Sequence, residues 1–93
     1  MALQARLTIS GRVQGVGYRD WAMTTGQRLG LAGWVRNRRD GAVEALIVGD
    51  EAAVGRMIEA RRHGPPLARV EEIDVDPVDL DILPDGFTRL PTE

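Results

Sequence analysis

Gly11-Arg12-Val13-Gln14-Gly15-Val16-Gly17-Tyr18-Arg19 is the stretch from which the predicted fold and the predicted site both follow. It closes a run from Ala5 in which apolar and polar residues alternate, as in a strand with one buried face. Its glycines permit backbone angles with which successive N–H groups line a concave nest. A helix beginning at Asp20 would add free amides and its positive dipole end. We therefore expect a phosphate-like anion here, held by Arg19 at the lip.

The same stretch departs from both common glycine-rich nucleotide motifs. It does not have the spacing G-x-G-x-x-G, and no Lys-Ser/Thr pair follows it as a P-loop requires. The predicted ligand is therefore a small phosphorylated molecule rather than a nucleotide.

Strand and helix patterns alternate along the rest of the chain. The predicted elements are strands over residues 5–13, 31–37, 42–48 and 68–75, helices from 20 to about 29 and from 51 to 63, and a short edge strand over 87–90. Asp40-Gly41 predicts a hairpin between the second and third strands. Val70 and Ile73 fall out of phase, which indicates a β-bulge in the fourth strand. In the tail, residues 78–82 alternate between apolar and acidic without a clear assignment.

This element order, β-α-β-β-α-β, predicts a ferredoxin-like α+β sandwich, with two helices on one face of an antiparallel sheet. A helix joins the first two strands, so they run parallel and the third strand fits between them. Their carboxyl ends then lie at the same edge. Arg19 and Asn37, eighteen residues apart in sequence, are therefore expected to face one site.

Composition narrows the chemistry. The 93 residues form one small domain without cysteine, and all twelve basic side chains are arginine, which excludes disulfides, thiolate metal ligands and a Schiff-base lysine. Ser10, Asn37 and His63 are single copies of their residue types, so a serine–histidine hydrolase or a zinc site would lack parts. No long apolar run and no signal-like N-terminus is evident, so we expect a soluble cytoplasmic protein without membrane contact.

Charge is divided unevenly along the chain. Residues 1–47 hold seven arginines and three acids, a net charge of +4, whereas residues 48–93 carry −6, which together give the overall −2. An anion site is therefore expected in the first half. The acidic whole argues against nucleic acid as a partner.

Two motifs resemble the acylphosphatase family. One is Gly11-x-Val13-Gln14-Gly15-Val16-x-Tyr18-Arg19, and the other is Gly33-Trp34-Val35-Arg36-Asn37-x-x-x-Gly41-x-Val43. Matches extend from about Ile9 to Val70, and residues 1–93 are expected to form a single acylphosphatase-like domain. The resemblance implies a ferredoxin-like fold and hydrolysis of the carboxyl–phosphate bond of acyl phosphates, giving a carboxylate and inorganic phosphate. It also implies no metal and no cofactor, and we expect a monomer whose partner is a small acyl phosphate.

The resemblance also implies which residues act. The catalytic residues are Arg19, which binds the phosphoryl group, and Asn37, which positions the attacking water. The phosphate-binding amides are those of Gln14, Gly15, Val16, Gly17, Tyr18 and Arg19. The tail departs most from the family's pattern, which we expect to affect the last strand and not the site.

These few residues fit the chemistry of an acyl phosphate. The leaving group is a carboxylate whose conjugate acid has a pKa near about 4, so it departs without being protonated and needs no general acid. Catalysis is then mainly positioning and electrostatic stabilisation. The carboxamide of Asn37 both donates and accepts hydrogen bonds, which suits it to hold a water in line. By hypothesis, the substrate's own phosphate oxygen accepts the proton.

Other interpretations remain open. Asn37 is often a turn residue, and Arg36, Arg38 and Arg39 are slightly better explained as a solvated hairpin than as anion attractors. Tyr18 and both tryptophans are expected to pack rather than to contact substrate. The aspartates of the tail suggest calcium but lack an EF-hand pattern. A non-enzymatic module for a phosphorylated metabolite and an RNA-binding module on the same scaffold are the alternative functions, although the first and third strands carry no aromatic residues for stacking bases.

Overall fold

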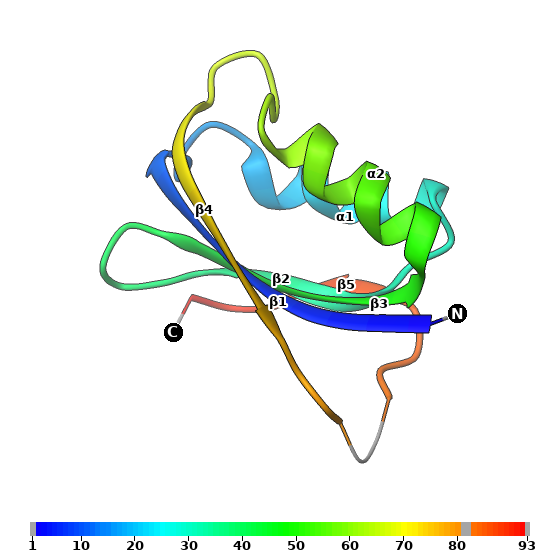
Figure 1. Cartoon of the computed structure of the whole chain (residues 1–93). Helices are drawn as coiled ribbons and strands as arrows, with labels where there is room; N and C mark the ends of the chain where they lie inside the picture. Colours follow the sequence, from blue (N-terminus) through cyan, green and yellow to red (C-terminus); the bar gives the residue numbers. More distant parts are fainter. Residues whose placement is uncertain (1, 81–82, 93) are drawn as a thin grey trace.

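The computed structural model describes residues 2–80 and 83–92, in which two helices cover one face of a five-stranded sheet (Figure 1). In chain order the elements are β1 (Ala2–Arg12), α1 (Tyr18–Arg28), β2 (Ala32–Asn37), β3 (Val43–Asp50), α2 (Glu51–Arg61), β4 (Arg69–Pro77) and β5 (Phe87–Arg89). This confirms the predicted ferredoxin-like fold and the edge strand in the tail. The alternating run over 78–82 forms no strand as far as residue 80, and its last two residues lie outside the described part.

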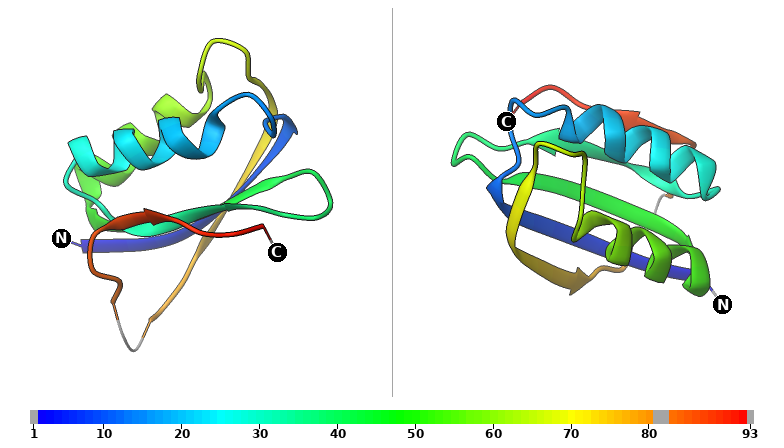
Figure 2. Two further views of the ribbon diagram at one scale, coloured as in Figure 1. Left: turned by 180° about the vertical axis from the view of Figure 1, so that it is seen from behind. Right: turned by 90° about the horizontal axis from the view of Figure 1, so that it is seen from above.

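The strand order β4-β1-β3-β2-β5 places β3 between β1 and β2, as the view from above in Figure 2 shows. β1 and β2 both pair antiparallel with β3, so they run parallel to each other, as expected. β5 adds a parallel pairing with β2, from Gly33 opposite Phe87 to Val35 opposite Arg89. The sheet is therefore antiparallel from β4 to β2 and ends in one parallel edge strand.

The predicted bulge lies where β4 pairs with β1. Ser10 is opposite Glu72 whereas Gly11 is opposite Val70, so Glu71 is the extra residue that shifts the alternation. A Cβ on Gly11, whose φ is 123°, would lie 2.2 Å from the carbonyl oxygen of Arg69. Only glycine fits this close approach of two backbones.

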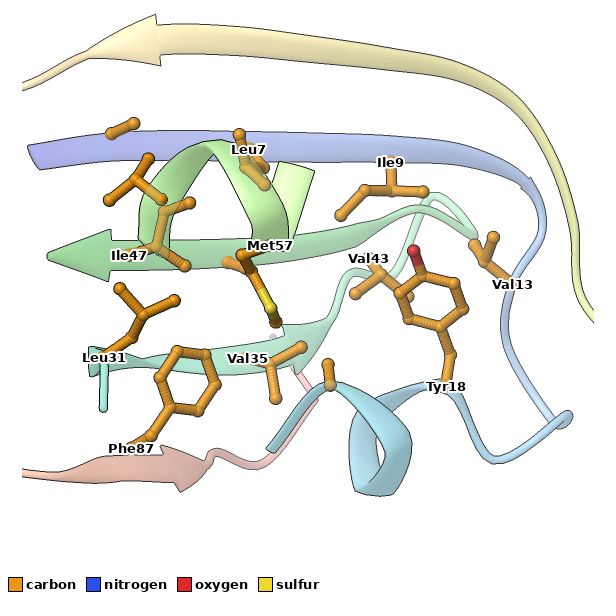
Figure 3. Packing of buried hydrophobic residues seen from close by; sticks show 14 residues of the cluster. Leu7, Ile9, Val13, Tyr18, Leu31, Val35, Val43, Ile47, Met57 and Phe87 are labelled. Atoms are coloured by element: carbon orange, nitrogen blue, oxygen red, sulfur yellow. The ribbon is translucent and has the colours of Figure 1, made fainter. Parts of the chain in front are cut away.

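Alternate residues of the strands pack beneath the helices (Figure 3). Leu7, Ile9, Val43 and Ile47 are fully buried there, and Met57 of α2 lies over them. Burial of these side chains supplies the hydrophobic stabilisation of the domain.

The ring of Phe87 in β5 packs against α1 at Gly26. A Cβ on Gly26 would lie 2.8 Å from that ring, so the helix needs glycine here in spite of a propensity cost of about 1 kcal/mol. Gln27 of the same helix donates from Nε2 to the carbonyl oxygen of Phe87 at 3.1 Å. The short edge strand is thus held by α1 as well as by β2.

The opposite face of the sheet is covered by long polar side chains. Glu44 is 7% exposed and accepts from Arg36 at 2.7 Å, while the Arg36 guanidinium lies 4.7 Å from the ring centroid of Trp34. Trp34 therefore packs on this face, away from the end of α1. Neither helix in the described part of the chain has the length and apolar content needed to cross a membrane.

Candidate active site

The loop between β1 and α1 is shaped by two glycines in the left-handed region. Gly15 has φ 73° and Gly17 has φ 80°, values that residues with a Cβ resist. Gly17 is the N-cap residue of α1, and its carbonyl oxygen accepts the first helical bond from the amide of Trp21 at 3.0 Å. The helix begins at Tyr18, two residues before the predicted start, so the amides of Tyr18 and Arg19 belong to the first turn and have no acceptor within the helix.

A cavity of about 100 Å³ opens at this end of α1. Its lining residues are Val13, Gly15, Gly17, Tyr18, Arg19, Asp20, Asn37 and Arg89. The volume suits a single tetrahedral anion and falls well below the roughly 300 Å³ or more of pockets that enclose a drug-sized ligand. Of the predicted site residues, the structure brings Gly15, Gly17, Tyr18, Arg19 and Asn37 together, whereas Gln14 and Val16 do not line the cavity.

Asn37 reaches the cavity because it ends β2. Alternate residues of a strand share a face, so Asn37 lies on the same face as Val35, which is fully buried under the helices. The hairpin turn follows it and is closed by the bond from the amide of Arg38 to the carbonyl oxygen of Ala42, at 2.8 Å. Asn37 is therefore a strand residue that lines the cavity together with the glycine loop, and the interpretation as a turn residue is wrong.

Arg19 lies between the loop and the tail of the chain. Its Nη1 atom donates to the carbonyl oxygen of Leu90 at 3.4 Å, a long bond that uses one of the five N–H donors of the guanidinium. Leu90 is itself held by its amide, which donates to the carbonyl oxygen of Val35 at 2.8 Å. The segment after β5 thus helps to orient the guanidinium.

The side chain of Gln14 joins the glycine loop between β1 and α1 to the hairpin after Asn37. Its Nε2 atom donates to the carbonyl oxygens of Arg38 at 2.7 Å and of Ala42 at 2.9 Å. Both amide protons of the side chain are used, and both acceptors belong to the turn that Asn37 enters. Only the backbone amide of Gln14 was predicted to act at the site, but its side chain sets the position of Asn37 relative to the loop.

We expect Gln14→Glu to lower kcat by about tenfold to a hundredfold, because a carboxylate has no proton for either carbonyl and would repel both. Steady-state kinetics on benzoyl phosphate would measure this. Gln14→Met, which keeps the length of the side chain without the charge, should show a smaller loss. A folded Gln14→Glu variant with wild-type kcat would contradict this positioning role.

Tyr18 packs beneath the loop, as predicted, with its ring in the hydrophobic cluster (Figure 3). Its side chain is 1% exposed, and its hydroxyl donates to the carbonyl oxygen of Arg61 at 2.7 Å. Burial raises the pKa of the Tyr18 hydroxyl. The phenol is therefore neutral and already engaged, and it is unsuited to act as a base.

Arg61, at the end of α2, is fully buried behind Tyr18. None of the described residues accepts a hydrogen bond from its guanidinium, whose Cζ atom lies 5.7 Å from the centroid of the Tyr18 ring. Burial lowers the pKa of Arg61 to about 10. An unpaired buried charge is costly, and the ring offsets only part of that cost.

Arg61→Met should raise the free energy of unfolding by about 1–3 kcal/mol at neutral pH, since it keeps an apolar stem and removes the charge. Chemical denaturation of both proteins would measure the difference. The folded-state pKa of Arg61 lies below the unfolded value, so the wild type gains stability as pH rises above about 10 and the difference should narrow there. A less stable Arg61→Met variant would show that contact with the Tyr18 ring outweighs the burial cost.

Comparison with known proteins identifies the family. The family model for acylphosphatases matches residues 5–88. The chain belongs to the acylphosphatase family. An acylphosphatase of Rhodospirillum rubrum is 57% identical over 84 residues, which cover 90% of this chain and 91% of that protein. The crystal structure of an acylphosphatase from Bacillus subtilis superposes with a TM-score of 0.90 at 38% identity, covering 97% of this chain and 99% of that one.

Acylphosphatase membership confirms the predicted family and, with it, the predicted activity, hydrolysis of acyl phosphates. The family match extends to residue 88, beyond the limit near Val70 that the motifs suggested. Full-length HypF in a phosphate- and nucleotide-bound form also superposes, with a TM-score of 0.89 over 12% of its chain, but at 24% identity this shows the fold alone.

Three residues that line the acylphosphatase cavity were not predicted as site residues, namely apolar Val13 and the charged Asp20 and Arg89. The expectation that the unusual tail would leave the site unaffected is wrong, since β5 brings Arg89 to the cavity and the Leu90 carbonyl to Arg19. The alternation of residues along β5 could have indicated that Arg89 lies at the cavity. If Phe87 faces the helices, alternation places Arg89 on the same face, beside the start of α1.

Proposed function

We propose that this cavity is where the chain hydrolyses acyl phosphates. The phosphoryl group is held by the Arg19 side chain and by the backbone amides of the loop residues that line the cavity, Gly15, Gly17, Tyr18 and Arg19. Asn37 orients the attacking water. The observation that carries this proposal is the convergence of a glycine loop, a guanidinium and a carboxamide on one cavity of about 100 Å³, from the ends of β1 and β2.

The reaction is a single displacement at phosphorus. Water attacks in line, the bond between phosphorus and the acyl oxygen breaks, and the carboxylate leaves with the electron pair. Charge spreads over the phosphoryl oxygens in the transition state, where the Arg19 fork and the first-turn amides stabilise it. The carbonyl oxygen of the Asn37 side chain accepts a hydrogen bond from the water, and its NH₂ group donates to a phosphoryl oxygen. The proton of the water passes to a phosphate oxygen.

No side chain lining the cavity in the described part of the chain is suited to be a general base. The Tyr18 hydroxyl is buried and donates to the backbone carbonyl oxygen of Arg61, and the Asp20 carboxylate is paired with Arg89. The carboxylate leaving group needs no acid either. Binding and orientation by Arg19, Asn37 and the loop amides are sufficient for the displacement.

Release of phosphate from benzoyl phosphate, measured with EDTA in the buffer, tests the proposal. We expect turnover that the chelator does not reduce, because the assigned residues act on the substrate directly. Phosphate binding without any turnover above the buffer rate would overturn the proposal and favour a binding module for phosphorylated metabolites. We further expect a monomer acting in the cytoplasm, and sedimentation would test the first of these.

A further inference from the structure

Two exposed, oppositely charged side chains form the rim of the cavity. Asp20 comes from the first turn of α1 and Arg89 from the end of β5, and Arg89 Nη1 makes an ion pair with Asp20 Oδ1. The two side chains are 64% and 45% exposed, so the pair sits in solvent at the opening rather than inside the cavity. Both residues nevertheless line the same cavity as Arg19 and Asn37.

The position of Arg89 is set by the backbone pairing of β5 with β2. Its backbone pairs with Val35. Two residues before Arg89, the buried ring of Phe87 packs against Gly26. The next amide, that of Leu90, donates to the carbonyl oxygen of Val35 at 2.8 Å. The strand therefore presents Arg89 to the start of α1 in a fixed register.

The pair decides the charge that an incoming anion meets. Arg19, Asp20 and Arg89 are the charged side chains that line the cavity within the described residues, and they sum to one positive charge. Without Arg89, the Asp20 carboxylate would cancel Arg19 beside the phosphoryl site. Coulomb repulsion between Asp20 and a phosphoryl dianion would then oppose binding.

The acyl group must lie at this rim. The cavity has room for a phosphoryl group only, so the rest of the substrate extends outward past Asp20 and Arg89. An uncharged acyl group leaves the ion pair intact. An acyl group with its own carboxylate would meet Asp20, and it gains Arg89 only by separating the pair.

We propose that Arg89, paired with Asp20, is a specificity-determining residue that favours acyl phosphates whose acyl group carries no further negative charge. The inference rests on the proposed function, in that the phosphoryl group is taken to occupy the cavity. Butyryl phosphate and succinyl phosphate form a matched pair of four-carbon substrates that differ in one terminal carboxylate. The ratio of their kcat/KM values measures the selectivity of the rim.

Asp20→Asn releases Arg89, so the ratio should shift about two- to fivefold toward succinyl phosphate, the range expected for one exposed ion pair. Arg89→Gln should raise KM for butyryl phosphate by a similar factor and leave kcat nearly unchanged. The double variant restores a neutral rim and should return KM for butyryl phosphate toward the wild-type value. These shifts should shrink in 1 M salt, where the Debye length is about 3 Å, whereas a purely structural role would not respond to salt.

Arg62→Gln is the matched control, because Arg62 makes an exposed ion pair with Glu59 on α2, away from the cavity. Calorimetry with inorganic phosphate separates this inference from the proposed function, since it needs no turnover. We expect Arg89→Gln to weaken phosphate binding two- to fivefold and Asp20→Asn to reverse the loss. An Arg89→Gln variant that behaves like Arg62→Gln, or a double variant that is no better than Arg89→Gln, would overturn the inference even if the wild type hydrolyses benzoyl phosphate.

Discussion

Arg19→Ala should lower kcat/KM for benzoyl phosphate by about a hundredfold to a thousandfold and should also weaken the binding of inorganic phosphate. The reason is that Arg19 lines the cavity beside the glycine loop. In the proposed mechanism it contacts the phosphoryl oxygens both in the bound substrate and in the transition state. Steady-state kinetics and calorimetry with phosphate would measure the two effects on the same preparations.

Two further variants sharpen that experiment. Arg19→Lys keeps the charge but loses the planar fork, so it should recover only part of the lost activity. Arg12→Ala is the matched control: Arg12 is an exposed arginine at the end of β1, and it lies outside the lining of the cavity. An Arg19→Ala protein that hydrolyses benzoyl phosphate at the wild-type rate would show that the phosphoryl group is bound elsewhere.

Asn37→Ala is expected to have the second largest effect, a loss of about a hundredfold in kcat with little change in the affinity for phosphate. In the proposed mechanism its carboxamide orients the water and contributes one hydrogen bond to the phosphoryl group, whereas Arg19 and the loop amides provide most of the binding. Comparison of kcat with the inhibition constant of inorganic phosphate separates these two contributions.

Asn37→Asp adds a test of charge at the same position. The carboxylate has the shape of the carboxamide but no N–H donors, and it would repel the phosphoryl group, so KM should rise as kcat falls. If Asn37→Ala instead lost phosphate affinity and kept its turnover, the roles of Asn37 and Arg19 would have to be exchanged.

The parts of the fold that follow from local patterns could be predicted from the sequence. Period-two alternation predicted β1, and the Asp40-Gly41 hairpin signal between two short strand patterns predicted β2 and β3. The phase change between Val70 and Ile73 marked the bulge at Glu71 in β4. The convergence of Arg19 and Asn37 followed from topology alone, because a helical crossover makes β1 and β2 parallel. Asn37 ends β2 and Arg19 follows the loop after β1, so the order of the strands is enough to predict that both lie at the same edge of the sheet.

Other parts of the site depend on tertiary contacts that no local pattern records. β5 has three residues, too few to show which face is buried, so alternation could place Arg89 beside α1 only once the burial of Phe87 was known. The two carbonyl partners of Gln14 exist only because the hairpin folds toward the loop. Arg61 occupies a position on α2 that amphipathic patterning assigns to the apolar stripe, yet its charge gives no sign that the side chain is fully buried.

The position of β3 between β1 and β2 has a consequence for how the enzyme can evolve. Neighbouring strands lie about 4.8 Å apart, so two such steps, about 10 Å in all, separate the strand that leads to Arg19 from the strand that ends in Asn37. Backbone hydrogen bonding sets this distance between β1 and β2, so substitution of side chains does not change it. Natural variation in this family should therefore leave the width of the phosphoryl site constant. It should change only the residues at the rim of the cavity, where the acyl groups of different substrates lie.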